Sequence, residues 1–157
     1  MAATLVYHIR PARLTDVPAL HELINTFAQR KLMLQRTLPE LYEMTRDFLV
    51  AEADFGGLVG CAAVHIDTDA IGELKSLAVA QSAQNCGVGR ALVKACAAEA
   101  RHLGLKRLFC LTYQVEFFTK LGYTKVDRSH LPQKVWSECV RCHRFLDCDE
   151  TAMWVQV

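Results

Sequence analysis

Residues 73–90, Glu-Leu-Lys-Ser-Leu-Ala-Val-Ala-Gln-Ser-Ala-Gln-Asn-Cys-Gly-Val-Gly-Arg, join an apolar strand pattern to a polar turn and a glycine-bearing helix start. Gly87 and Gly89 carry no Cβ, so a ligand can approach the backbone closely. A helix beginning near Val88 offers unpaired N–H groups and a positive dipole end to an anion. The spacing Gln84-x-x-Gly87-x-Gly89 has neither the Lys-Ser/Thr ending of a Walker loop nor a third glycine. It predicts a phosphate-binding turn, the alternative being an ordinary glycine-containing turn.

Length and charge restrict the class of protein. The 157 residues include 18 basic and 17 acidic side chains, which leaves a net charge of +1. This length fits one domain over residues 1–157, and the charge balance favours neither nucleic acid nor a membrane surface as a partner. No apolar run reaches the ~20 residues of a membrane span, and the first residues are typical of a strand rather than a signal peptide. We expect a cytoplasmic protein that binds small molecules.

The periodicity of apolar residues predicts alternating strands and helices. Strands are expected at residues 7–10, 48–53, 58–66, 73–79, 107–113 and 151–157. Helices are expected at residues 17–27, capped by Thr15 or Asp16, and at 39–48, 88–103 and 116–121. This order implies an α/β fold in which helices cover a mixed sheet.

Cysteine usage favours reduced thiols, because seven is an odd number and apolar segments surround four of them. Those four, which we expect to be buried, are Cys61, Cys86, Cys96 and Cys110.

The other three cysteines, Cys139, Cys142 and Cys148, have the spacing Cys-x2-Cys-x5-Cys. Thiolates at this spacing could hold structural zinc if His130, His143 or Asp149 supplied a fourth ligand. Three ligands are one short of a closed site, so zinc is not expected. A disulfide or redox switch and plain reduced thiols are the alternatives.

Three further blocks narrow the family. They are Leu111-Thr-Tyr-Gln-Val-Glu-Phe-Phe-Thr-Lys-Leu-Gly-Tyr123, Leu131-Pro-Gln-Lys-Val-Trp136, and Cys139-Val-Arg-Cys142 followed by Cys148-Asp-Glu150. With the phosphate turn, they resemble the GNAT N-acetyltransferases, and among these the short stand-alone N-acetylglutamate synthase type. The resemblance implies a mostly antiparallel sheet splayed at its fourth and fifth strands. It also implies acetyl transfer from acetyl-CoA to the α-amine of L-glutamate, or L-glutamine, as the first step of arginine biosynthesis.

The resemblance also implies the residues that hold acetyl-CoA. The turn would bind the pyrophosphate, and the strand before it would present its backbone to the pantetheine arm. The two phenylalanines of the block Leu111–Tyr123 belong to the core or contact the cofactor. The expected cofactor-binding residues are Leu77, Ala78, Val79, Gln84, Asn85, Cys86, Gly87, Val88, Gly89, Arg90, Phe117 and Phe118.

Glu73 and Lys75 are the charged residues of the strand before the turn. Their spacing puts both side chains on one face, shared with Leu77 and Val79, unless a bulge interrupts the strand. Glu73 is the candidate general base, since an amine must lose a proton before it attacks a thioester. Lys75 could bind a substrate carboxylate. The alternatives are a solvated carboxylate and a surface lysine.

The departing thiolate requires a proton or a hydrogen bond. Many GNAT enzymes supply it from a tyrosine at a position that is Phe118 here. The donor is therefore Tyr113, water or no group at all, and Tyr113 could equally be a packing aromatic.

A glutamate substrate would need cations for its two carboxylates. Arg30, Lys31 and Arg36 lie between the first two expected helices and are candidates for this, although a basic loop can also be merely solvated.

Two other readings stay open. One is a GNAT enzyme that acts on another amino acid or a polyamine, and the other is a non-catalytic acyl-CoA-binding or interaction module. The apolar C-terminal strand is compatible with a homodimer, because edge strands invite pairing.

Overall fold

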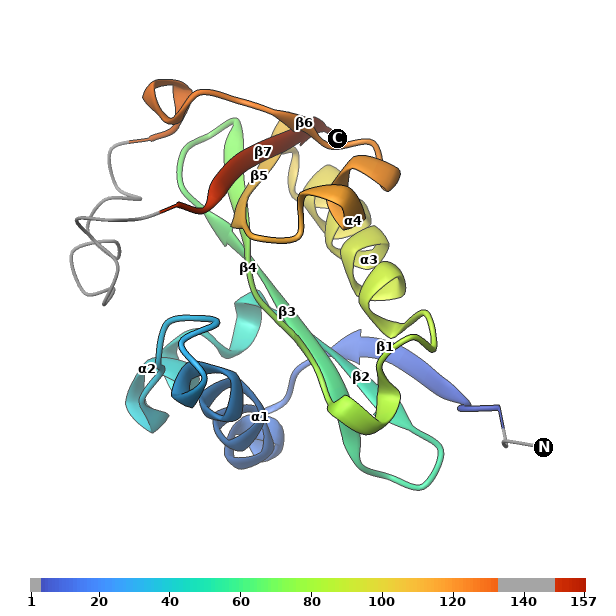
Figure 1. Cartoon of the computed structure of the whole chain (residues 1–157). Coiled ribbons are helices and arrows are strands. Elements are labelled where there is room, and N and C mark those ends of the chain that lie inside the picture. The colour runs from blue at the N-terminus through green and yellow to red at the C-terminus, as the bar shows by residue number, and fades with distance from the viewer. Residues whose placement is uncertain (1–3, 133–148) are drawn as a thin grey trace. The chain divides into compact units, whose positions relative to one another are not determined.

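The structure, a computed structural model, describes residues 4–132 and 149–157. Figure 1 shows its strands and helices. The strands are β1 (Tyr7–Pro11), β2 (Phe48–Ala53), β3 (Leu58–Ile66), β4 (Ile71–Val79), β5 (Arg107–Thr112), β6 (Thr124–Lys125) and β7 (Thr151–Gln156). The helices are α1 (Val17–Gln29), α2 (Leu38–Glu43), α3 (Val88–Leu103) and α4 (Val115–Lys120), with 3₁₀ turns η1 (Leu14–Asp16), η2 (Thr45–Asp47), η3 (Gln81–Ala83) and η4 (Arg128–His130).

The strands form one mixed sheet in the order β1-β2-β3-β4-β5-β7-β6. The pairs β1/β2, β2/β3, β5/β7 and β6/β7 are antiparallel, whereas β4 and β5 are parallel. This parallel pairing joins only Ile71–Glu73 to Arg107–Phe109, after which the two strands no longer pair. The expected mixed, mostly antiparallel sheet, splayed at its fourth and fifth strands, is confirmed.

Two elements differ from the sequence prediction. The helix expected over 39–48 ends at Glu43, and the 3₁₀ turn η2 then leads into β2 at Phe48. The Thr45 hydroxyl donates to the carbonyls of Leu41 and Tyr42, both at 3.0 Å, at the end of this helix. Strand β6 was not predicted, because two exposed residues carry no periodic signal.

The chain divides into two compact units. Unit 1 comprises Met1–Ala63 and Ser76–Cys96, and unit 2 comprises Val64–Lys75 and Ala97–Val157. Strands β3 and β4 and helix α3 each contribute residues to both units. Within the described residues, no helix combines the length and apolar character needed to cross a membrane.

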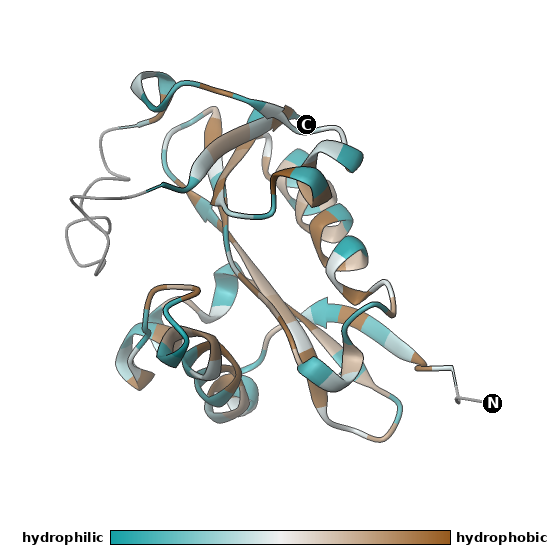
Figure 2. Ribbon diagram, in the orientation of Figure 1, coloured by the Kyte–Doolittle hydropathy of each residue, from teal (hydrophilic) through white to brown (hydrophobic). Residues whose placement is uncertain are grey.

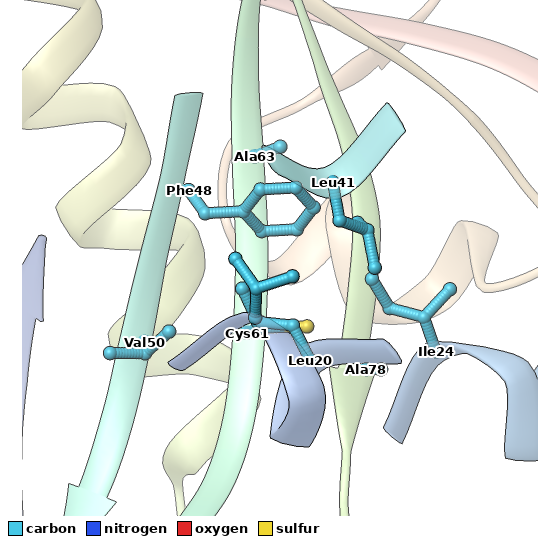
Figure 3. Packing of buried hydrophobic residues seen from close by; sticks show 9 residues of the cluster. Leu20, Ile24, Leu41, Phe48, Val50, Cys61, Ala63 and Ala78 are labelled. Atoms are coloured by element: carbon cyan, nitrogen blue, oxygen red, sulfur yellow. The ribbon is translucent and has the colours of Figure 1, made fainter. Parts of the chain in front are cut away.

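The core of unit 1 lies between the helix pair α1/α2 and one face of the sheet (Figure 3). Strand β3 supplies much of it and is apolar along most of its length (Figure 2). The opposite face of β3 meets α3, since a Cβ on Gly60 would lie 2.9 Å from Leu92 and 3.0 Å from Val88. The core residues on the α1/α2 side are Val17, Leu20, Ile24, Leu41, Phe48, Val50, Cys61, Ala63 and Ala78.

Unit 2 has its own apolar cluster, built on Phe109, Leu131 and Ala152. Strand β7 pairs with β5 along its whole length, from Thr151 to Gln156. The Arg107 guanidinium stacks over the ring of Trp154, 4.1 Å from the ring centroid. The C-terminal strand β7 therefore lies inside the sheet, between β5 and β6, and is not the edge strand expected as a dimer contact.

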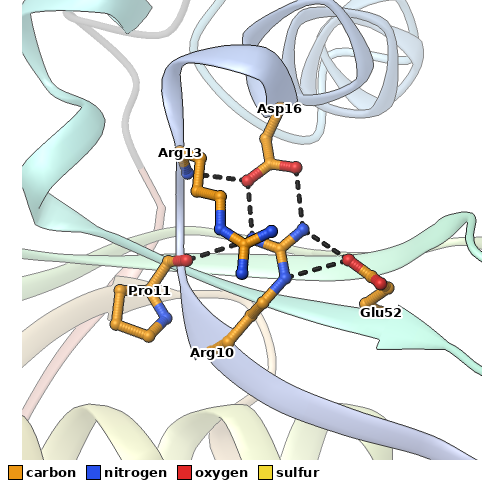
Figure 4. A network of polar contacts seen from close by, with 5 residues as sticks. All are labelled: Arg10, Pro11, Arg13, Asp16 and Glu52. Atoms are coloured by element: carbon orange, nitrogen blue, oxygen red, sulfur yellow. Dashed lines mark hydrogen bonds and ion pairs between the residues drawn. The ribbon is translucent and has the colours of Figure 1, made fainter.

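A polar network joins β1, β2 and the entry to α1 (Figure 4). The Arg10 guanidinium donates to both carboxylate oxygens of Asp16, at 2.7 and 2.9 Å, and also to Glu52. Asp16 also accepts from the Arg13 backbone N–H at 2.7 Å. Asp16 therefore fixes the start of α1 through Arg10 and Arg13, and it makes no side-chain cap bond to α1 itself.

Arg10 and Asp16 of this network have shifted pKa values. Hydrogen bonding from Arg10 is the main cause that lowers the pKa of Asp16, against the opposing effect of burial. The same hydrogen bond is the main cause that raises the pKa of Arg10. Because the folded pKa of Asp16 is depressed, its contribution to stability is present above about pH 4, the ordinary pKa of the carboxyl, and is lost as the pH falls through the folded pKa.

Replacing Asp16 by Asn should lower the free energy of unfolding by about 1–3 kcal/mol at neutral pH, because Arg10 and the Arg13 N–H lose a charged acceptor. The variant should also lose less stability than the wild type as the pH falls below about 4. Urea unfolding at several pH values measures both effects. The exposed Asp69→Asn is the control and should change stability by less than about 0.5 kcal/mol. An Asp16 variant with wild-type stability would contradict this assignment.

Candidate functional site

The phosphate loop, residues 84–90, connects β4 and η3 to helix α3 within unit 1. Asn85 and Gly87 have left-handed backbones, with φ of 62° and 83°. The Gly87 carbonyl accepts from the Ala91 N–H at 3.0 Å, so the helix begins there. The N–H groups of the first turn, which precede this bond, have no acceptor within the helix. Residues 84–87 are exposed, so the loop offers these donors to an anion.

Gln84 ties this loop to the end of β4. Its side-chain Nε2 donates to the Val79 carbonyl at 3.1 Å. Gln84 thus fixes the loop, while Asn85 and Gly87 turn the chain toward the helix. Arg90 is exposed in the first helical turn, where its charge could reach a bound phosphate. The loop thus exposes backbone and one cation at the start of α3, and its binding of a phosphate stays a prediction.

Strand β4 bends at Ser76, a non-glycine residue with φ of 55°. The bend lies between Lys75 and Leu77, so the strict alternation of side chains stops there. Glu73 and Lys75 keep the spacing expected for a common face, while Leu77 and Val79 follow the Ser76 interruption and belong to unit 1. The sequence allowed for a bulge that would interrupt this strand, and the interruption is the single left-handed residue Ser76.

A buried thiol contacts the Ser76 bend. Cys61 of β3 is 0% exposed, and its Sγ donates to the Ser76 carbonyl at 3.4 Å. Burial raises the pKa of this thiol to about 12, so it stays protonated and can act as a donor. Sequence reasoning missed both Ser76 and the role of Cys61, since nothing in an apolar strand pattern indicates a left-handed residue.

Glu73 lies in unit 2, in the part of β4 that pairs with β5. It is buried, with 8% of its surface exposed. Its charge, together with that of Glu150, adds to burial in raising the pKa of the Cys110 thiol. Glu73 is therefore not the solvated strand-end carboxylate that was the alternative. Lys75 is half-buried.

The candidate substrate cations lie in unit 1 after α1. Arg30 and Lys31 are exposed, and the Lys31 backbone is left-handed with φ of 59°. The Lys31 N–H donates to the Ala28 carbonyl at 2.9 Å and the Leu32 N–H to the Phe27 carbonyl at 3.1 Å, which is a Schellman ending with lysine at the usual glycine position.

Arg36 differs from the other two cations because it is buried, with 4% of its surface exposed. The Asn25 side chain of α1 donates to the Arg36 carbonyl at 2.9 Å and accepts from its N–H at 3.1 Å. This clamp fixes the Arg36 backbone against α1.

Tyr113, Phe117 and Phe118 lie in unit 2, at and beyond the end of β5. Tyr113 is 39% exposed. Phe118 is buried and packs edge-on against Phe117 and Tyr123, with ring centroids 5.1 and 5.0 Å apart. Phe118 is therefore a packed core residue. Phe117 is half-buried.

Cysteine placement corrects one expectation. Cys61, Cys96 and Cys110 are buried as predicted, but Cys86 is exposed, because it lies in the phosphate loop rather than in an apolar segment. Cys139, Cys142 and Cys148 lie outside the described residues. Within the described ranges, no group of three His, Cys, Asp or Glu side chains could hold a metal ion.

The sequence profile of the GNAT acetyltransferase domain matches residues 45–125, which include β2 to β6 and the phosphate loop. The chain belongs to the GNAT acetyltransferase family. It is 36% identical over 145 residues to an uncharacterized N-acetyltransferase of Chlorobaculum tepidum, covering 92% of this chain and 93% of that protein. It is also 36% identical over 137 residues to an amino-acid acetyltransferase of Mycobacterium tuberculosis, covering 86% of this chain and 78% of that protein.

Solved GNAT structures agree with this assignment. A Mycobacterium tuberculosis protein crystallised with CoA and a second ligand superposes with a TM-score of 0.81 at 33% identity, covering 96% of this chain and 99% of that one. The N-acetylglutamate synthase of Neisseria gonorrhoeae, complexed with coenzyme A and N-acetyl-glutamate, superposes with a TM-score of 0.85 at 28% identity. That match covers 99% of this chain and 36% of the synthase. The predicted resemblance to the N-acetylglutamate synthase type of GNAT protein is confirmed, and the neighbours' CoA agrees with the predicted cosubstrate.

Replacing Lys31 by Gly should raise the free energy of unfolding by about 0.5–1 kcal/mol, because glycine adopts a left-handed backbone without the steric cost that lysine has. The same substitution at Lys94, exposed within helix α3, should instead lower it by about 0.7 kcal/mol. Chemical denaturation of both variants measures this difference in sign. Destabilisation by Lys31→Gly would contradict the strained C-terminal ending of α1.

Cys86 should react with iodoacetamide in the native protein, while Cys61 and Cys110 should react only after unfolding. Both buried thiols have raised pKa values, and the thiolate is the reactive form. Peptide-resolved mass spectrometry after a short labelling pulse measures each site, with Cys86→Ser as the control for assignment. Equal labelling of Cys61 and Cys86 would contradict the described burial.

Proposed function

We propose that this protein transfers the acetyl group of acetyl-CoA to the α-amino group of L-glutamate, the first step of arginine biosynthesis. The observation that carries the proposal is the likeness to the Neisseria gonorrhoeae N-acetylglutamate synthase over 99% of this chain, with a bound acetylated glutamate in that structure. The amino-acid acetyltransferase of Mycobacterium tuberculosis, of comparable length, supports an amino acid as the acceptor.

The phosphate loop would hold the pyrophosphate of acetyl-CoA. Its exposed backbone and the first turn of α3 supply N–H donors, and Arg90 supplies a positive charge. The backbone of Leu77–Val79, beyond the point where β4 stops pairing with β5, would bind the pantetheine arm. In this proposal, the segment of β4 after Ser76 binds the cofactor, and the segment before it carries the candidate base Glu73.

The reaction removes two protons from the amine nitrogen and adds one to the CoA sulfur. The glutamate ammonium first loses a proton to Glu73, directly or through a water molecule. The free amine then attacks the thioester carbonyl, so that a C–N bond forms and the C–S bond breaks, and the nitrogen releases its second proton to water. The CoA thiolate leaves and takes a proton from Tyr113, which solvent reprotonates, or from water. No covalent intermediate on the protein is involved, and binding both substrates together supplies the orientation.

Arg30, Lys31 and Arg36, which follow α1 in unit 1, would bind a carboxylate of the acceptor. Lys75 of β4 is a further candidate. The strained backbone of Lys31 supports a functional role, because non-glycine residues in left-handed conformations concentrate at ligand sites. Asn25 already holds the Arg36 backbone, so the side chain of Arg36 would start from a fixed position.

Glu73→Gln should lower kcat for glutamate acetylation by about 100-fold or more, because it removes the base but keeps the side-chain shape. The Kd for CoA should stay unchanged. The assay measures free CoA release from acetyl-CoA with glutamate as acceptor. Glu73→Asp should restore part of the activity, and the exposed Glu43→Gln is the control.

Three results would contradict parts of this proposal. Full activity in Glu73→Gln would exclude Glu73 as the base. Turnover with a polyamine but not with glutamate would show a different acceptor in the same enzyme family. CoA binding without turnover on any acceptor would favour a non-catalytic acyl-CoA-binding module.

A further inference from the structure

Tyr7, the first residue of β1, reaches the phosphate loop with its side chain. A Cβ placed on Gly87 would lie 3.8 Å from the Tyr7 Oη, and no other atom outside the neighbouring residues would come within 4 Å of it. Both residues belong to unit 1. The phenol is therefore the side-chain group next to the left-handed glycine of the loop, and the family pattern gives it no role.

The register of β1 explains this placement. Tyr7 faces Ala53 of β2 and Arg10 faces Val50, so Tyr7 and Arg10 point to opposite faces of the sheet. Arg10 points to the face of Asp16 and the α1 entry, which is the α1/α2 side (Figure 4). Tyr7 consequently lies on the α3 side, as the phosphate loop does. Its small cross-strand neighbour Ala53 leaves room for the ring.

The Tyr7 hydroxyl is available for a ligand. The side chain is half-buried, and within residues 4–132 and 149–157 its Oη makes no hydrogen bond. The adjacent loop residues 84–87 are exposed. A phenol O–H beside a set of backbone N–H donors is suited to a phosphate oxygen, since it adds a charge-assisted hydrogen bond without adding a charge.

We propose that Tyr7 is a further cofactor-binding residue whose hydroxyl donates a hydrogen bond to the pyrophosphate of CoA on the phosphate loop. The inference rests on the proposed function, because it needs the loop to hold CoA. Tyr7 thereby joins the edge strand β1 to the cofactor, whereas the other proposed pyrophosphate contacts all come from the loop and α3.

Tyr7→Phe tests this role because it removes only the hydroxyl. Its Kd for CoA, measured by isothermal titration calorimetry, should rise about tenfold, which corresponds to the loss of about 1.4 kcal/mol for a hydrogen bond to a charged group. The Kd for dephospho-CoA, which keeps the pyrophosphate, should rise by the same factor. The Kd for pantetheine, which lacks the pyrophosphate, should not change. Tyr42→Phe, at an exposed tyrosine of α2, is the matched control and should behave as the wild type.

The possible failures separate the two proposals. A wild-type protein that binds no CoA would overturn the proposed function and this inference with it. A wild-type protein that binds CoA, with Tyr7→Phe binding equally well, would overturn the inference alone. A loss that is as large for pantetheine would indicate a packing role for Tyr7 and would also overturn it. A loss that disappears with dephospho-CoA would overturn the assignment to the pyrophosphate.

Discussion

The bend of β4 at Ser76, contacted by the protonated Cys61 thiol, is the constraint on which the candidate site depends. Before the bend, Ile71–Glu73 pair with β5 in a regular parallel ladder and Glu73 is buried. After it, Leu77–Val79 have left β5, and Gln84 ties the phosphate loop to the Val79 carbonyl. One strand thus supplies both a buried carboxylate and the backbone leading to an anion site.

Backbone strain occurs in the segments whose sequence predicts a functional role. The described non-glycine residues with positive φ are Lys31, Ser76 and Asn85. Lys31 lies among the candidate substrate cations, Ser76 follows Glu73 and Lys75, and Asn85 lies in the phosphate loop. Such conformations cost of order 1–3 kcal/mol each and persist only where surrounding structure enforces them. The Schellman bonds after α1, the Cys61 thiol and the Gln84 side chain are the contacts that accompany the three positions.

Periodicity and turn chemistry predicted most of the fold, because the helices α1 and α3 are amphipathic and the longer strands are apolar runs bounded by turn residues. The phosphate loop was also predictable, since Gly87 and Gly89 are unusual at the start of a helix. The Ser76 bend was not, because serine in an apolar strand carries no signal for a left-handed backbone. The sequence pattern predicted that Cys86 lies buried in an apolar segment, although the same pattern also predicted the turn that exposes it. The proposed role of Tyr7 depends on the register of β1 with β2 and on the closeness of Tyr7 to Gly87. Only the folded chain brings these two residues together.

Identification of the acetylated product tests the central claim most directly. The purified protein would be incubated with acetyl-CoA and an equimolar mixture of glutamate, glutamine, lysine and spermidine, and the products would be identified by mass spectrometry. The account predicts N-acetylglutamate as the main product, because the basic residues proposed to bind the acceptor suit a substrate with two carboxylates. Acetylspermidine or acetyl-lysine as the main product would contradict it.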